Sequence, residues 1–285
     1  MITFLAKILA RFSLPTIHRL GSFVGWAIHF LTPAGAKIQR ANLKQSQLAN
    51  HHLNAVIKAN IVESGKSLLE TFAIWQKKEA ELLPLVKKIH HWDVVESALK
   101  SSKGIIFLTP HLGCFEITSI YYGSLHPITV LYRAPKQAWL KPLIQAGRTR
   151  TGVTLAEANA SGVRKLLQAL KRGEAVGILP DQIPAEGEGE WADFFGKPAY
   201  TMTLASKLAE KTGAVVIMAF GERLANGAGY HLHVKKIESI ATPNLLNQAI
   251  EAQIAENPSQ YLWRYNRYKL RRHALNKQTI SSKEN

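Results

Sequence analysis

From residue 103 onward, the chain alternates short apolar runs with amphipathic helical segments. One helix follows Ser161, keeps its apolar residues at i, i+3, i+4 and i+7, and ends at Gly173. Strands that alternate with helices form a parallel sheet covered on both faces. We therefore expect an α/β fold with a mostly parallel central sheet, flanked by helices on both faces. Four runs have the length and composition of buried strands: GIIFLTP (104–110), ITVLY (128–132), AVGILP (175–180) and AVVIMAF (214–220).

Two further segments complete the outline of this domain. The apolar spacing in 53–75 predicts a helix, and YHLHVKKI at 230–237 alternates like a strand with one wet face, as at a sheet edge. Residues 35–285 contain neither an internal repeat nor a linker rich in Pro, Gly or Ser. We expect one domain over 35–285, preceded by a distinct segment over 1–34.

The segment 1–34 is the most apolar part of the chain. Its longest apolar core, 20–31, covers about 18 Å as a helix, which is short of the ~30 Å of bilayer hydrocarbon. Three interpretations remain open: an interfacial or marginally spanning membrane helix, a signal peptide cleaved after Ala36, and a pair of core helices. We favour the first, an apolar N-terminal helical segment that associates with the membrane.

The charge of the chain favours an anionic partner. Lys and Arg total 36 against 20 acidic residues, so the formal net charge is +16 among 285 residues. Such a surface suits nucleic acid, an anionic membrane, a phosphorylated lipid or an acidic carrier protein. The single cysteine, Cys114, excludes an intramolecular disulfide, a Cys-ligated zinc site and an iron–sulfur cluster.

Two of the expected strands end in proline followed by a titratable residue. His111 follows IIFLTP, and Asp181 follows VGILP. Functional groups in open α/β sheets gather beyond the carboxyl ends of strands, so both residues are candidates for a site.

His111 also begins the spacing H-x4-E with Glu116. Chance predicts about 11 × 20/285 ≈ 0.8 such pairs of His with an acid in a chain of this composition. The chain has three, since His91/Glu96 and His233/Glu238 share the spacing, so the spacing alone carries little information. Only His111 follows a buried strand, where a carboxylate on one imidazole nitrogen can make the other a general base.

Four ordered blocks together resemble a known family: HLGCFE, LYRAPK, ILPDQ and WADFFGKPAYT. They are similar to the lysophospholipid acyltransferase-like superfamily, and more narrowly to the bacterial lipid A biosynthesis lauroyl/myristoyl acyltransferases. The resemblance implies that His111 is the general base and that Glu116 orients it. It also implies that Arg133 contacts the acceptor phosphate or the reaction centre and that Asp181 is a carboxylate that supports the site. Arg148, in the basic segment AGRTRTG, could hold phosphate in the same way.

The same resemblance implies the partners of an O-acyltransferase. A medium-chain acyl group passes from an acyl carrier protein thioester to a hydroxyl of a Kdo-bearing lipid A precursor. No cofactor, metal or covalent acyl-enzyme is expected. The enzyme is expected at the bacterial inner membrane, on the anionic leaflet, with its catalytic domain facing the cytoplasm.

Other features of the sequence leave alternative functions open. A lysophospholipid or glycerolipid O-acyltransferase would use the same strand ends. A basic protein that binds a membrane surface or nucleic acid would use the basic, aromatic tail 260–273, although the chain has no nucleic-acid-binding module and we expect no nucleic-acid partner. His231 and His233 share a strand face and could bind a metal, but the sequence shows no third ligand.

Overall fold

A seven-stranded sheet forms the centre of the computed structural model, which describes residues 2–49, 52–135, 137–150 and 152–269. The strand order is β1-β9-β8-β2-β5-β3-β4, and every neighbouring pair is parallel except β8 with β9. The mostly parallel sheet is therefore confirmed. Its strands are β1 (Val86–His90), β2 (Ile105–Leu108), β3 (Ile128–Tyr132), β4 (Val153–Glu157), β5 (Ala175–Ile178), β8 (Val215–Arg223) and β9 (Tyr230–Lys236).

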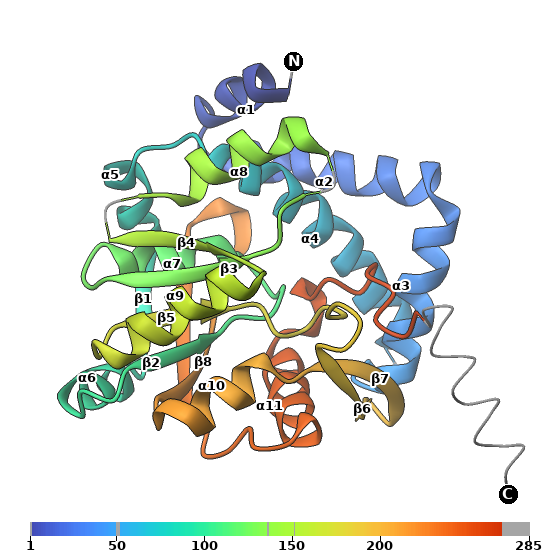
Figure 1. Cartoon of the computed structure of the whole chain (residues 1–285). Coiled ribbons are helices and arrows are strands. Elements are labelled where there is room, and N and C mark those ends of the chain that lie inside the picture. Colours follow the sequence, from blue (N-terminus) through green and yellow to red (C-terminus); the bar gives the residue numbers. More distant parts are fainter. Residues whose placement is uncertain (1, 50–51, 136, 151, 270–285) are drawn as a thin grey trace, which may run out of the picture.

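Helices cover both faces of this sheet, as expected (Figure 1). The apolar faces of α9 (Ala160–Lys171), α10 (Leu204–Thr212) and α11 (Pro243–Glu256) pack on one side of it, and α6 (Asp93–Lys100) and α7 (Phe115–Gly123) pack on the other. The remaining helices are α1 (Ile2–Ala10), α2 (Leu14–Leu31), α3 (Pro33–Ser46), α4 (Leu53–Ile74), α5 (Glu79–Leu82) and α8 (Lys141–Arg148).

The edge of the sheet differs from the sequence expectation. The strand expected at 230–237 is β9, but it lies between β8 and β1 instead of at the edge. The edge strand is β1. Its sequence VKKIH shows no apolar strand pattern, because two of its residues are exposed and the other three are only partly buried. A separate hairpin, β6 (Gly189–Phe194) with β7 (Lys197–Met202), packs beside α11. The apolar pattern of the sequence does not predict this hairpin.

The N-terminal helices are packed against the domain. In α2, the side chains of Ile17 and His18 are buried, and a Cβ at Gly65 of α4 would overlap the backbone of Gly21 and Gly25. This close helix contact makes α2 part of the core. Among the described residues, no helix combines the length and the apolar character needed to cross a bilayer, so the expected apolar membrane segment is not supported.

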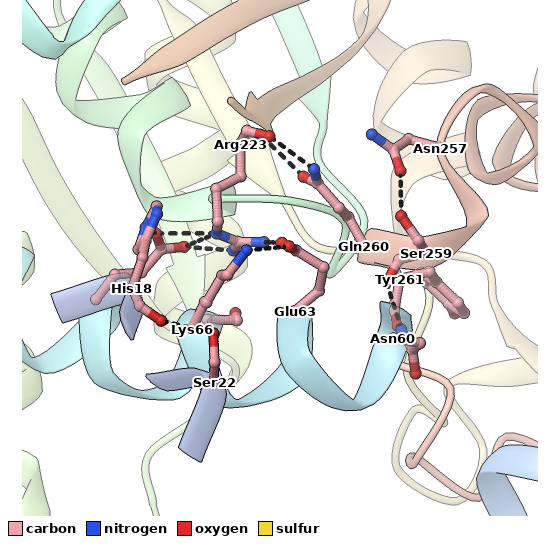
Figure 2. A network of polar contacts seen from close by, with 12 residues as sticks. His18, Ser22, Asn60, Glu63, Lys66, Arg223, Asn257, Ser259, Gln260 and Tyr261 are labelled. Atoms are coloured by element: carbon pink, nitrogen blue, oxygen red, sulfur yellow. Dashed lines mark hydrogen bonds and ion pairs between the residues drawn. The ribbon is translucent and has the colours of Figure 1, made fainter. Parts of the chain in front are cut away.

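A buried ionic network joins α2 and α4 to the end of β8. Arg223 donates to both oxygens of Glu70 and, at 2.7 Å, to Glu63, while His18 Nε2 lies 2.9 Å from Glu70 Oε2. Figure 2 shows the side chain of Arg223 reaching Glu63. It also shows the side-chain amide of Gln260, which makes two hydrogen bonds with the backbone of Arg223. The network thereby ties the N-terminal helices to the segment after α11.

Two arginines of the basic tail 260–273 form hydrogen bonds with other parts of the protein. Arg267 is buried and donates to the Tyr200 carbonyl and the Thr201 hydroxyl, and Arg264 donates to Thr32. These two arginines are therefore used within the protein. Residues 270–273 of the tail lie outside the described residues.

Candidate active site

His111 and Asp181 meet at the carboxyl ends of two neighbouring strands. Their strands, β2 and β5, pair in parallel, so the residues that follow them emerge side by side. His111 Nδ1 lies 2.8 Å from Asp181 Oδ1, and the His111 backbone N–H donates to Oδ2 at 3.0 Å. One carboxylate thus holds both the ring and the backbone of the histidine.

The charge on Asp181 assigns the histidine tautomer. The carboxyl is buried, which by itself raises its pKa, but the interaction with His111 and the hydrogen bonds from it outweigh burial and lower the pKa below the ordinary value. An ionised carboxylate can only accept, so Nδ1 carries the proton and Nε2 presents a lone pair. Gln182 Nε2 lies 3.2 Å from that nitrogen and can donate to it. His111 is 16% exposed, which leaves it accessible to a substrate.

Glu116 has a different partner from the one that the H-x4-E spacing implies. It lies in the first turn of α7, and its buried carboxylate accepts hydrogen bonds from Arg148 Nε at 2.9 and 3.0 Å and from Nη2. The carboxylate hydrogen-bonded to His111 is that of Asp181. The structure therefore brings His111 together with Asp181, and Glu116 together with Arg148.

The loop that carries His111 is fixed by backbone contacts. The N–H groups of Gly113 and Cys114 donate to the carbonyls of Gln260 and Gly221 at 3.1 and 2.7 Å. Gly113 has φ +58°, and a Cβ there would overlap the Gly221 carbonyl, so this position requires glycine. Burial raises the pKa of the Cys114 thiol well above its usual range, which makes it an inert core residue.

An apolar cavity lies near the histidine, between the sheet and α7. Its walls also hold Thr109, Gly177, and the Glu116–Arg148 pair. Phe115 connects the two features, because its ring packs 4.9 Å from the His111 ring and also lines the cavity. The space encloses about 600 Å³, including its open part, which is the size of a small-molecule site. The apolar and aromatic lining residues are Trp92, Phe107, Phe115, Tyr122, Ile128, Val130, Ile178, Leu179, Ala219, Leu232 and Val234, and His233 lines the same cavity.

The remaining arginines near the site have distinct positions. Arg133 follows β3, is exposed, and reaches the Ile183 carbonyl at 3.4 Å, two residues beyond Asp181. Arg150 donates instead to the backbone carbonyls of Ile74 and Lys77, and its role is structural. Arg133 is thus an exposed cation close to the segment that carries Asp181.

Part of this site could have been found from the sequence. Asp181 and Gln182 stand at the end of a strand that the apolar pattern predicts, and that position is the signal that links them to His111. No spacing rule indicates the pairing, because 70 residues separate the two side chains. The adjacency of β2 and β5 comes only from the sheet order.

Comparisons with known proteins identify the family of the chain. The family model for bacterial lipid A biosynthesis acyltransferases matches residues 1–270. The chain is 25% identical to the lipid A biosynthesis palmitoleoyltransferase of Escherichia coli strain K12, covering 90% of this chain and 86% of the relative. It is also 25% identical, with the same coverage, to the lauroyltransferase of that strain, and 19% identical to its myristoyltransferase, covering 89% and 80%. The chain therefore belongs to the bacterial lipid A biosynthesis acyltransferase family.

Proposed function

We propose that this acyltransferase of lipid A biosynthesis moves a medium-chain acyl group from an acyl carrier protein thioester to a hydroxyl of a Kdo-bearing lipid A precursor. The observation that carries this proposal is the His111 imidazole, accessible at the joined ends of β2 and β5, with a buried carboxylate on Nδ1. That arrangement leaves Nε2 as a general base.

The chemistry follows from the tautomer. The acceptor hydroxyl takes the place of the Gln182 amide at Nε2 and gives its proton to that nitrogen while its oxygen attacks the thioester carbonyl. Asp181 stabilises the imidazolium that forms. When the tetrahedral intermediate collapses, the C–S bond breaks and the imidazolium returns the proton to the thiolate of the carrier protein. We assign Asp181 as the residue that positions His111.

Charge development on the thioester oxygen requires donors. Arg133 or backbone N–H groups can supply them, since Arg133 is exposed close to the segment that carries Asp181. Arg133 is also suited to bind a phosphate of the acceptor through its planar guanidinium. Glu116 and Arg148, joined in a bidentate pair, hold the wall of the cavity next to Phe115.

We assign the apolar cavity to the acyl chain. It is lined mostly by aliphatic and aromatic side chains, and one of them, Phe115, packs against His111. An acyl chain that enters along this wall brings its thioester carbonyl to the histidine. In this proposal the cavity floor at Gly177 and Val130 limits the chain length.

The outer surface of the N-terminal helices supports membrane association. Phe23, Phe30 and Leu31 of α2 are 73–80% exposed, and Phe4 of α1 is 67% exposed. Apolar side chains beside basic ones, here including Arg19, suit the interface of an anionic bilayer. We propose that this surface lies on the cytoplasmic leaflet of the inner membrane, where both the lipid acceptor and the carrier protein are accessible.

The test is acyl transfer with purified protein. Wild type and His111→Ala are mixed with detergent-dispersed lipid IVA bearing Kdo and with carrier-protein thioesters of several chain lengths, and the lipid masses are read. We expect one acyl addition by wild type and a roughly 10²–10⁴-fold slower reaction in the variant.

A matched control comes from a second H-x4-E pair. His91 is exposed and has φ +62°, which Asn tolerates, so His91→Asn should retain full activity. A folded wild type that acylates glycerolipids but not lipid IVA would contradict the proposed acceptor. Undiminished activity of His111→Ala would contradict the proposed base.

A further inference from the structure

Three histidines gather on the two outermost strands at one edge of the sheet, and one of them, His233, also lines the apolar cavity. His231 and His233 lie two residues apart on β9, so their side chains share one face. His90, the last residue of β1, pairs in register with His233 and therefore lies on the same face. The third ligand that the sequence does not show thus comes from the neighbouring strand.

The imidazoles are close enough to share one ion. One ring nitrogen from each lies within 4.8 Å of the other two. The rings of His90 and His233 are 4.5 Å apart, and those of His90 and His231 are 5.3 Å apart. His90 Nε2 is buried and has no hydrogen-bond partner in the part of the chain that the structure describes. A buried nitrogen without a partner is costly unless something else satisfies it.

A carboxylate already orients one of the three rings. Glu222 on β8 pairs across the strands with His231, and its Oε2 lies 2.8 Å from His233 Nε2. A carboxylate beside Nε2 fixes the proton on that nitrogen and leaves the lone pair of Nδ1 free to bind a metal, as in the carboxylate–histidine–metal arrangement. His233 is therefore held in the tautomer that a metal requires.

We propose that His90, His231 and His233 form a binding site for a divalent transition metal of the zinc class. Three imidazoles suit Zn²⁺, Co²⁺, Ni²⁺ or Cu²⁺, and they offer none of the oxygen ligands that Mg²⁺ and Ca²⁺ prefer. The fourth position would be open to water. Lys88, which pairs in register with His231, adds a positive charge that Glu222 partly offsets.

The geometry needs only side-chain adjustment. Zn–N bonds of about 2.0–2.1 Å in a tetrahedral site place the nitrogens about 3.4 Å apart. Because all three side chains are only partly buried, rotation of the rings from the stacked arrangement closes the remaining distance. The ion would join β1, the exposed edge strand, to β9 by side chains in addition to backbone hydrogen bonds. We assign the ion a role in stabilising the fold, and His233 is the one of its three ligands that also lines the apolar cavity.

The experiment uses untagged full-length protein in detergent, freed of metal with EDTA and dialysed. Co²⁺ is titrated in while the visible absorbance of cobalt is followed, and Zn²⁺ is then added to displace it. We expect one equivalent of Co²⁺ with a tetrahedral or five-coordinate spectrum, and a higher Tm with Zn²⁺. His90→Ala, His231→Ala and His233→Ala should each abolish both effects.

Two further variants make the result specific. Glu222→Gln keeps all three ligands and should weaken binding about 10–100-fold. His91→Asn removes the exposed neighbour of His90 and should bind like wild type. The proposal is refuted if wild type binds no stoichiometric Co²⁺, or if His90→Ala, folded by circular dichroism, binds it as wild type does. Because His90 lies at an exposed edge, that variant decides the matter even if His233→Ala misfolds.

Discussion

The buried ion pair between Glu70 and Arg223 makes stability depend on pH in a way that can be calculated. Burial alone would raise the pKa of Glu70, but Arg223 and His18 outweigh it and hold the pKa at about 2, against an ordinary value of 4.5. At about 1.4 kcal/mol for each tenfold change in a dissociation constant, the carboxylate contributes about 3 kcal/mol at neutral pH. Because the folded-state pKa is the lower one, this contribution is complete above pH 4.5 and is lost as pH falls toward 2.

The perturbation is Glu70→Gln, followed by urea unfolding at pH 7 and at pH 3. Other carboxyl groups also protonate, so the quantity to read is the difference in unfolding free energy between wild type and variant. From the same two pKa values, the part of this difference due to ionisation should fall at pH 3 to about half of its value at pH 7. Glu238→Gln, which removes an exposed pair with Lys236, should change stability by less than about 1 kcal/mol at either pH. A Glu70→Gln difference that is under 1 kcal/mol at pH 7, or that does not shrink at pH 3, would refute the reasoning.

Two other predictions concern the cavity and the buried thiol. A Cβ at Gly177 would lie 3.3 Å from Val130 and 3.5 Å from Ile128, both of which line the cavity, so Gly177→Ala should shift the preferred donor toward shorter acyl chains in a competition among carrier-protein thioesters. An unchanged preference would remove Gly177 from the acyl site. Cys114 is buried with a raised pKa, so it should resist iodoacetamide at pH 8 in the folded protein, and Cys114→Ala should retain acyl transfer. Loss of turnover in a folded Cys114→Ala variant would instead indicate a thiol intermediate.

The sequence predicts the layers of this fold better than its edges. Buried strands such as 128–132 are continuous apolar runs, and their type and place are recovered. The edge strand β1 has the sequence VKKIH, in which the two lysines are exposed and the other three residues are partly buried, so its pairing with β9 leaves no apolar pattern to detect. For the same reason, the sequence does not show that His90 lies beside His231 and His233 in the proposed metal site.

The N-terminal helices show a second limit of sequence patterns. An apolar helix that packs on its neighbour and one that lies in a membrane interface have similar compositions. What separates them here is a helix contact through Gly21, Gly25 and Gly65, together with the buried His18–Glu70 pair. Contacts between residues about 50 positions apart are set by tertiary packing, and local periodicity does not contain them.

The sequence points to both His111 and Asp181 but does not show that they pair. His111 follows from its strand end and from the family resemblance, and Asp181 stands out at a strand end as well. The resemblance favours Glu116 as the orienting acid because it is close in sequence. In the structure, Glu116 begins α7 and pairs with Arg148, while sheet order brings Asp181 to the imidazole.

The pH dependence of acyl transfer in Asp181→Asn and Glu116→Gln tests the central claim, that Asp181 positions His111 as the base. A carboxylate beside an imidazole favours the imidazolium, so its removal should move the acidic limb of the kcat profile to lower pH. We expect Asp181→Asn to show that displacement together with a roughly 10²–10⁴-fold lower kcat. Glu116→Gln, which leaves the His111–Asp181 hydrogen bonds in place, should lower activity without moving the limb. A limb that moves in Glu116→Gln and stays in place in Asp181→Asn would assign the histidine to Glu116 and contradict the account.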